Sequence, residues 1–234
     1  EGVKRVLNDT ENFSSRFGPA WLIFNDPPRH SKLRALVSRA FTPKSVANLE
    51  PRIAELSAGL LKENVERGKM DLALDFAVPL PIMVIAEMLG IPLSDREQFK
   101  SWLDVILLRS YTIGRHDTQE LQAVNRFNEC MREMRAYLNH LLDQRRQSPK
   151  DDLLTRLDQA EIDGQRLTRD EILGFFQLLL LGGSETTTNL INNAILCFIE
   201  HPAELARLRA DMSLLPSAIE EVLRYRAPFQ WMYR

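Results

Sequence analysis

Several features that would assign this chain to a particular class of protein are scarce or missing. Its 234 residues include only two cysteines, Cys130 and Cys197. Both fall in helical patterns without metal-ligand spacing, which favours reduced thiols in a cytosolic core. The formal net charge is only −2, so the overall charge favours neither nucleic acid nor an anionic membrane as a partner. No secretory signal is visible, and we predict a cytoplasmic location.

Strand patterns are missing as well. No alternating polar and apolar runs flanked by hairpin turns are found, and no internal repeat or low-complexity linker divides the chain. Hydrophobic residues make up 44% and charged residues 26%, which is ordinary for a globular protein that buries a substantial core. Helical periodicity dominates, so the sequence predicts a mainly α fold in one domain over residues 1–234.

The pattern of apolar residues and helix boundaries predicts a series of helices. In the second of them Asp26 is expected to act as the capping residue, and in the longest amphipathic one an apolar stripe from Leu121 to Leu142 is expected to face the core. Irregular segments are expected over residues 12–27 and 109–118. The expected helices cover residues 2–9, 26–41, 43–67, 74–89 with an interruption at Pro79 and Pro81, 94–108, 118–147, 168–199, 202–211 and 214–226.

The segment LLLLGGSETTTN, residues 178–189, is unusual within the expected helix over 168–199. Thr168 and Glu171 form a capping-box start, and apolar residues continue to Ile199. A glycine inside a helix costs roughly 1 kcal/mol relative to alanine, and adjacent threonines lower helix propensity further. The length of the apolar stretch is that of a membrane span, but its polar centre favours a core helix in a protein that does not cross a membrane.

The polar centre of this helix has a chemical and a structural interpretation. Thr186 lies one turn after Gly182, so its hydroxyl can bond the Gly182 carbonyl and leave room for water or oxygen. Glu185 can pass protons if water reaches it. The alternative is a helix that bends and packs closely against a neighbour through small residues. This segment alone does not separate the two.

Two further pairs of residues have candidate roles. His30 and Arg34 are four residues apart near a helix start, where they can bind a carboxylate or a phosphate; on this pair alone, a solvated basic face is the better interpretation. Glu221 and Arg224 are three residues apart on another helix, and such pairs are common on surfaces.

Taken together and in this order, DPPRHSKLRALVSRAFTP, LLLLGGSETTTN and EEVLR resemble segments of the cytochrome P-450 family, most closely its soluble bacterial members. The resemblance implies that the chain forms the helical portion of that fold, including its long central helix, and that this portion is incomplete at both ends. It also implies haem b as cofactor and a monooxygenase that inserts one atom of dioxygen into a small hydrophobic substrate. Electrons would come from NAD(P)H through ferredoxin and ferredoxin reductase or similar partners.

The resemblance also implies roles for individual residues. Glu185 and Thr186 would be the catalytic residues that deliver protons during oxygen activation. The segments over residues 12–27 and 109–118 resemble variable lids over the substrate pocket. The remaining implied roles are haem propionate binding by His30, Arg34 and Arg234, close approach of the helix to the haem at Gly182 and Gly183, substrate contact by Leu178, Leu181, Phe229 and Gln230, and a buried structural pair of Glu221 with Arg224.

One departure from the family pattern concerns the iron ligand. The family places the ligating cysteine in a glycine-containing loop, and no such segment occurs here, so we assign neither Cys130 nor Cys197 as a ligand. We therefore expect the chain to be part of a longer protein and inactive alone. The competing hypothesis is a non-catalytic helical binding or regulatory protein whose glycines and threonines permit tight packing.

Overall fold

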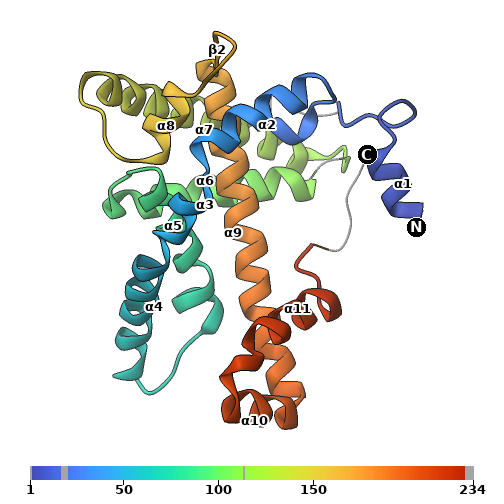
Figure 1. Ribbon diagram of the computed structural model, residues 1–234, viewed down its shortest axis with the longest axis vertical. Coiled ribbons are helices and arrows are strands. Elements are labelled where there is room, and N and C mark those ends of the chain that lie inside the picture. The colour runs from blue at the N-terminus through green and yellow to red at the C-terminus, as the bar shows by residue number, and fades with distance from the viewer. Residues whose placement is uncertain (1, 17–20, 113, 230–234) are drawn as a thin grey trace.

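The computed structural model describes residues 2–16, 21–112 and 114–229, and almost all of its regular structure is helical (Figure 1). This confirms the predicted mainly α fold. The α-helices are α1 (Gly2–Asn8), α2 (Arg29–Ala40), α3 (Pro43–Ala47), α4 (Glu50–Val65), α5 (Pro79–Met88), α6 (Arg96–Thr112), α7 (Thr118–Gln147), α8 (Leu153–Gln159), α9 (Arg169–Glu200), α10 (Pro202–Ala210) and α11 (Leu215–Tyr225). Short turns of other helix types are η1 (Leu22–Phe24), η2 (Ala73–Ala77), η3 (Leu93–Asp95) and η4 (Met212–Leu214).

Helix α9 is the axis of the molecule. It contains 32 residues and runs the height of the view in Figure 1, with α5, α6, α7, α10 and α11 all in contact with it. The predicted capping box is present: the Thr168 side chain accepts from the Glu171 backbone N–H, and the Glu171 carboxylate accepts from the Thr168 N–H. No described helix is long and apolar enough to cross a membrane.

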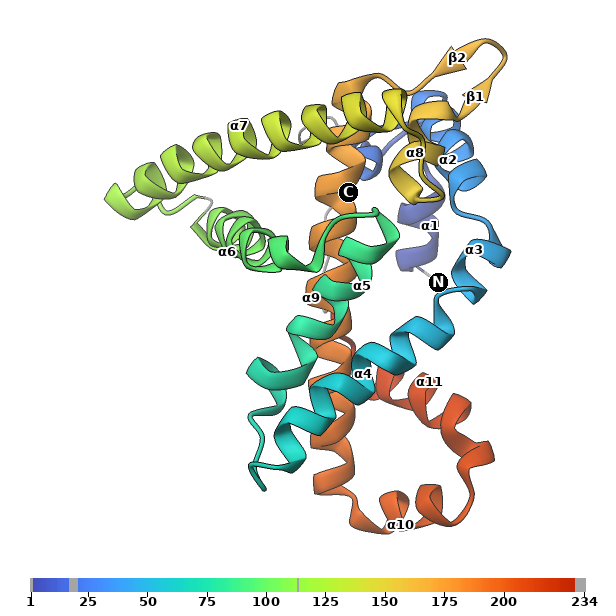
Figure 2. The same ribbon diagram turned by 90° about the vertical axis from the view of Figure 1, so that its left-hand side faces the viewer.

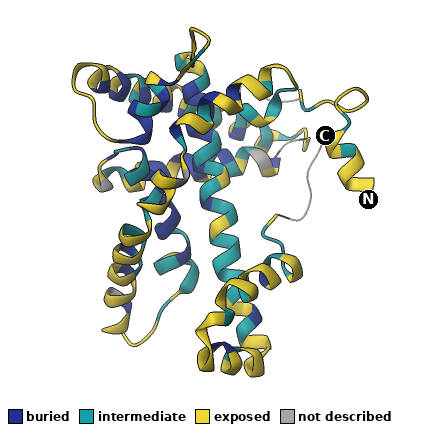
Figure 3. Cartoon of the chain, viewed as in Figure 1, coloured by how far each residue is buried: buried dark blue, intermediate teal, exposed yellow. Residues whose placement is uncertain are grey.

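The main hydrophobic core surrounds the N-terminal half of α9. Phe99 and Trp102 of α6 pack with Phe176 of α9, and all three side chains are almost completely buried. Trp21 reaches the same core from the segment before α2 and donates from its indole Nε1 to Gln177 Oε1 at 2.7 Å. Buried residues concentrate in this part of the molecule, whereas α10 and α11 remain largely exposed (Figure 3).

Three predicted helix boundaries were wrong. Helix α2 begins at Arg29, because the Asp26 carboxylate instead accepts from Ser14 Oγ at 2.6 Å and from the Ser15 backbone N–H at 2.9 Å. The expected helix over residues 43–67 is divided into α3 and α4, with Pro51 in the first turn of α4. Helix α6 continues to Thr112, so the expected loop over 109–118 is shortened at its start.

Two expectations about packing and strands also need correction. Helix α7 has the predicted bounds, but Leu121 is 66% exposed, because α7 extends away from α9 at this end (Figure 2). A short antiparallel hairpin joins β1 (Glu161–Ile162) to β2 (Gln165–Arg166). Its turn residues Asp163 and Gly164 both have positive φ, as a two-residue hairpin turn requires, and Asp-Gly is a favoured sequence for such a turn.

Candidate functional site

The polar centre of α9 has the backbone geometry that the sequence predicts. Thr186 Oγ1 donates to the carbonyl oxygen of Gly182 at 2.5 Å, within the same helix. This bond engages the hydroxyl proton and leaves the hydroxyl oxygen free to accept. Thr188, two residues further on, donates across to the Ala77 carbonyl at 2.8 Å and so ties α9 to η2. Neighbouring threonines therefore differ: Thr188 is a packing contact between elements, whereas the bond of Thr186 stays within α9.

The two glycines before Thr186 face different surroundings. A Cβ atom placed on Gly182 would meet nothing within 4 Å, so this side of the helix is open. A Cβ atom on Gly183 would lie 3.0 Å from Ile85 Cδ1 of α5. Consecutive helix residues point about 100° apart, which explains the difference. Gly183 therefore permits close packing of α9 on α5, and the approach of both glycines to one flat ligand face stays a prediction.

Glu185 is bound to a residue that the sequence did not indicate. Tyr111, in the last turn of α6, donates its phenol hydroxyl to Glu185 Oε1 at 3.0 Å. This hydrogen bond, together with burial, raises the pKa of Tyr111, because the neutral phenol is the donor to a carboxylate. The carboxylate next to Thr186 is thus held by a helix that lies 74 positions earlier in the chain.

Two asparagines on α9 hold the segment that follows α11. Asn193 Nδ2 donates to the Arg226 carbonyl at 3.0 Å, and Asn189 Nδ2 donates to the Pro228 carbonyl at 3.4 Å. Both lie on the stripe of α9 that continues from Gly182 and Thr186 at intervals of three and four residues. Phe229, 57% exposed, comes directly after the held segment. The polar stripe of α9 therefore holds the segment that leads to Phe229 at positions about one and two helical turns after Thr186.

The other predicted ligand residues lie on separate surfaces or outside the described residues. Leu178 and Leu181 are partly buried against the main core. On α2, His30 is half-buried and lies beside the buried side that carries Leu33, whereas Arg34 is exposed. Within the described part of the chain, neither His30 nor Arg34 has a side-chain hydrogen bond or ion pair. Gln230 and Arg234 lie outside the described residues.

The orientation of α2 is set by a neighbouring ion pair. Arg29 Nη2 lies 2.8 Å from Glu171 Oε1, which joins the start of α2 to the start of α9. The apolar side of α2 meets η1 and α8. His30 and Arg34 are therefore carried by an anchored helix, and their donor groups are available to an anion.

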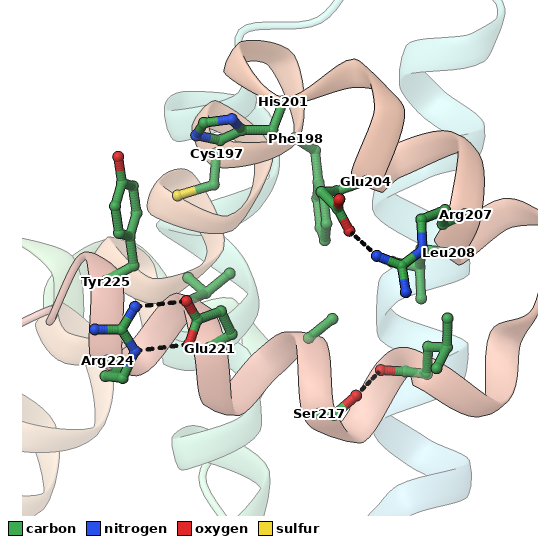
Figure 4. Close-up of a pocket in the computed structure, with 13 residues that line it drawn as sticks. Cys197, Phe198, His201, Glu204, Arg207, Leu208, Ser217, Glu221, Arg224 and Tyr225 are labelled. Atoms are coloured by element: carbon green, nitrogen blue, oxygen red, sulfur yellow. Dashed lines mark hydrogen bonds and ion pairs between the residues drawn. The ribbon is translucent and has the colours of Figure 1, made fainter.

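Glu221 and Arg224 form the predicted pair but not in the predicted environment. Two hydrogen bonds of 2.7 and 2.6 Å join them, and the side chains are 60% and 70% exposed. Helix α11 buries Val222 against its neighbours and leaves the pair on the rim of a cavity of about 610 Å³, which Cys197 and His201 of the α9 end also line (Figure 4). The expectation of a buried pair is thus wrong for the described structure.

Both cysteines lie within helices and are shielded from solvent. Cys130 and Cys197 are buried free thiols on α7 and α9. Burial, and then the nearby Glu133 carboxylate, raise the pKa of Cys130 to about 12. Among the described residues no group of three or more histidine, cysteine, aspartate or glutamate side chains is arranged to hold a metal ion.

Comparison with known proteins agrees with this arrangement. The cytochrome P-450 family model matches residues 2–233. The cyclomarin C epoxidase CymV of Salinispora arenicola is 45% identical over 86% of this chain and 50% of its own length. Cytochrome P-450 109 of Bacillus spizizenii is 43% identical over 98% of this chain and 57% of its own. The structure of CYP109E1 from Bacillus megaterium with testosterone gives a TM-score of 0.86 at 42% identity, covering 98% of this chain and 60% of that one. The chain thus spans between half and three-fifths of the length of these relatives, and it belongs to the cytochrome P-450 family.

Proposed function

We propose that the protein to which this chain belongs is a haem-dependent monooxygenase that inserts one atom of dioxygen into a hydrophobic substrate. Electrons would come from NAD(P)H through a ferredoxin and its reductase, in the cytoplasm, and residues 1–234 would form a single domain or the helical part of one. The observation that carries the proposal is the juxtaposition on α9 of an open glycine, a threonine hydroxyl and an adjacent carboxylate. Family membership supplies the reaction class.

The described residues fit one side of a haem and its propionates. Gly182 presents backbone without a side chain toward open space, which suits a flat ligand at close range. The donor groups of His30 and Arg34 suit anionic propionates. We place the iron ligand outside the described residues, since Cys130 and Cys197 are both buried free thiols within helices. When bound, a thiolate-ligated haem b supplies the chemistry of oxygen activation.

The roles of the chain's own residues follow from their contacts. The Thr186 hydroxyl is oriented by its bond to the Gly182 carbonyl, so that its oxygen can accept a hydrogen bond from water at the open face. Glu185 is the adjacent ionisable group and can return a proton to that water. Leu178, Leu181 and Phe229 would provide apolar contacts for the substrate, and together with Gln230 they would shape its pocket.

The substrate class is proposed from the apolar candidates and from the relatives. One relative is named for the epoxidation of cyclomarin C, and one structural neighbour was determined with testosterone. We therefore propose a small hydrophobic molecule as substrate, with testosterone as a first probe.

The test uses the full-length, haem-loaded protein with Thr186→Ala and the neighbouring Thr187→Ala as matched control. Thr186→Ala loses a hydrogen bond of roughly 0.5–1.5 kcal/mol and gains up to about 0.7 kcal/mol of helix propensity, so stability should change little. We expect normal haem content and a ferrous–carbonyl spectrum typical of a thiolate-ligated haem. We also expect at least a tenfold higher ratio of hydrogen peroxide released to NAD(P)H consumed.

Thr187 is exposed, and Thr187→Ala should leave that ratio at the wild-type value. Absence of the thiolate-type spectrum in the full-length wild-type protein would refute the proposed function. Equal peroxide ratios in the two threonine variants would refute the role of Thr186.

A further inference from the structure

The end of α6 is connected to the polar centre of α9 by one side-chain hydrogen bond. Tyr111 Oη donates to Glu185 Oε1 at 3.0 Å. The Tyr111 ring is 70% exposed, so burial of the ring contributes little to holding this helix end. The bond is therefore made by the polar tip of an otherwise exposed aromatic side chain.

The other described contacts of this helix end do not reach α9. Thr112 Oγ1 donates back to the Leu108 and Arg109 carbonyls of α6 itself. Arg109 lies 3.5 Å from Glu120, which belongs to α7. Among the α6 residues before Thr112 whose burial is described, the last buried one is Ile106, and Leu108 is 39% exposed. Among the described side-chain hydrogen bonds and ion pairs, the Tyr111–Glu185 bond is thus the direct connection between the last turn of α6 and α9.

The bond also restricts the carboxylate next to Thr186. A glutamate in a helix has several staggered rotamers, and a hydrogen bond to one oxygen selects among them. Thr186 is itself oriented by the Gly182 carbonyl. In the described arrangement, both polar side chains are therefore held by partners other than each other, and the Glu185 carboxylate is directed toward α6.

We propose that Tyr111 is a positioning residue for Glu185, a latch that couples docking of the α6 end to the orientation of the carboxylate beside Thr186. This inference rests on the proposed function, in which Glu185 moves protons. When the α6 end is docked, the phenol holds the carboxylate in one orientation. When the α6 end moves away from α9, Glu185 is released and takes other rotamers.

The chain provides a matched control for removal of a phenol hydroxyl. Tyr137 of α7 donates to Asp95 Oδ2 at 2.6 Å, and its ring packs edge-on against Phe99 and Trp102. This bond also joins a tyrosine to a carboxylate on another element, but it lies at the opposite end of α6 from Tyr111. Tyr137→Phe therefore makes the same chemical change without touching Glu185.

The experiment compares Tyr111→Phe, Glu185→Gln, the double variant and Tyr137→Phe in the full-length, haem-loaded protein. Hydrogen exchange monitored by mass spectrometry should rise at least threefold over residues 107–117 in Tyr111→Phe and in the double variant, and less in Glu185→Gln, whose neutral amide still accepts a weaker bond. Tyr137→Phe should leave exchange in this segment unchanged. Unchanged exchange in Tyr111→Phe would overturn the latch.

A second readout separates positioning from a purely structural contact. With a ferredoxin and its reductase as electron donors and testosterone as probe, Tyr111→Phe should raise the peroxide formed per NAD(P)H consumed at least threefold. The KM for the probe should change less than twofold. The double variant should release no more peroxide than Glu185→Gln alone, because the effect of Tyr111 acts through Glu185. Additive effects would overturn the positioning role even if the exchange result holds.

Failure of the proposed function has a different signature. If Glu185→Gln leaves the peroxide ratio at the wild-type value, Glu185 does not move protons, and the proposed function loses that residue. The exchange measurement then still decides whether Tyr111 holds the carboxylate. Loss of the thiolate-type carbonyl spectrum would likewise refute the monooxygenase without altering the exchange result.

Discussion

Alanine substitutions at Gly182 and Gly183 should have opposite effects on stability, although the two glycines are adjacent. Replacing a helix-interior glycine by alanine stabilises a helix by about 1 kcal/mol, partly by restricting the unfolded chain. At Gly182 the new methyl group meets nothing within 4 Å, so the gain is unopposed. We expect Gly182→Ala to raise the free energy of unfolding of the haem-free protein by about 1 kcal/mol.

At Gly183 the same methyl group would lie 3.0 Å from Ile85 Cδ1. Ile85 is 4% exposed and has little room to move, and inserting a methyl group into a packed core typically costs about 1–3 kcal/mol. After subtraction of the helix-propensity gain, we expect Gly183→Ala to lower the free energy of unfolding by up to about 2 kcal/mol.

Haem binding should reverse the ranking of the two variants. Under the proposed function, the Gly182 face lies against the cofactor, so the added methyl group occupies space that the haem needs. Gly182→Ala should then retain less haem than Gly183→Ala, measured as bound haem per protein after reconstitution, while guanidinium titration of the haem-free proteins reports stability. Destabilisation by Gly182→Ala, or undiminished haem affinity in that variant, would refute this reasoning.

Three further predictions concern stability and the predicted substrate pocket. Gly90→Ala should destabilise the protein by at least about 2 kcal/mol in denaturant titration, because Gly90 has a φ of +68° and a Cβ atom there would overlap with Oδ2 of the buried Asp152. A smaller effect would contradict the left-handed backbone conformation of Gly90. Asn193→Ala should raise the KM for a hydrophobic probe several-fold, because it releases the segment before Phe229. Asn192→Ala, the control, should leave the KM unchanged, and equal KM values in the two variants would contradict the role of Asn193 in holding that segment. The Asp117 carboxylate caps α7, and its pKa is lowered chiefly because it accepts a hydrogen bond from the Glu120 backbone N–H. Its contribution to the free energy of unfolding is therefore present above the ordinary carboxyl pKa and is lost as the pH falls through the lowered pKa. Asp117→Ala should flatten the acid side of the stability–pH curve, and an unchanged acid side would contradict this assignment.

Long helices with strong local signals were predicted accurately. The bounds of α7 match the expected 118–147, and the capping box of Thr168 and Glu171 starts α9 as predicted. The bond from Thr186 to the Gly182 carbonyl was also anticipated, since it joins residues one turn apart. These features depend on residues within a few positions of one another, so the local sequence contains the information needed to predict them.

Shorter elements and exposed faces were predicted less well. The Asp163–Gly164 hairpin carried a recognisable turn signal, but its strands are only two residues each and show no alternation. The exposure of the Glu221–Arg224 pair depends on what α11 packs against, which spacing alone does not contain. The prediction of a single domain, and the proposed roles of His30, Arg34, Gln230 and Arg234, remain predictions.

The amino-acid sequence by itself determined the mainly helical fold, the family and the position of an unusual polar centre within the longest helix. Only the tertiary structure decided which neighbours each residue of that helix contacts. It separated the open Gly182 from Gly183, which packs on Ile85, and it brought Tyr111 to Glu185 and the Arg226 carbonyl to Asn193. The physical reason is that local spacing specifies the angle at which a side chain leaves its helix, whereas the neighbour at that angle is specified by packing between distant parts of the chain.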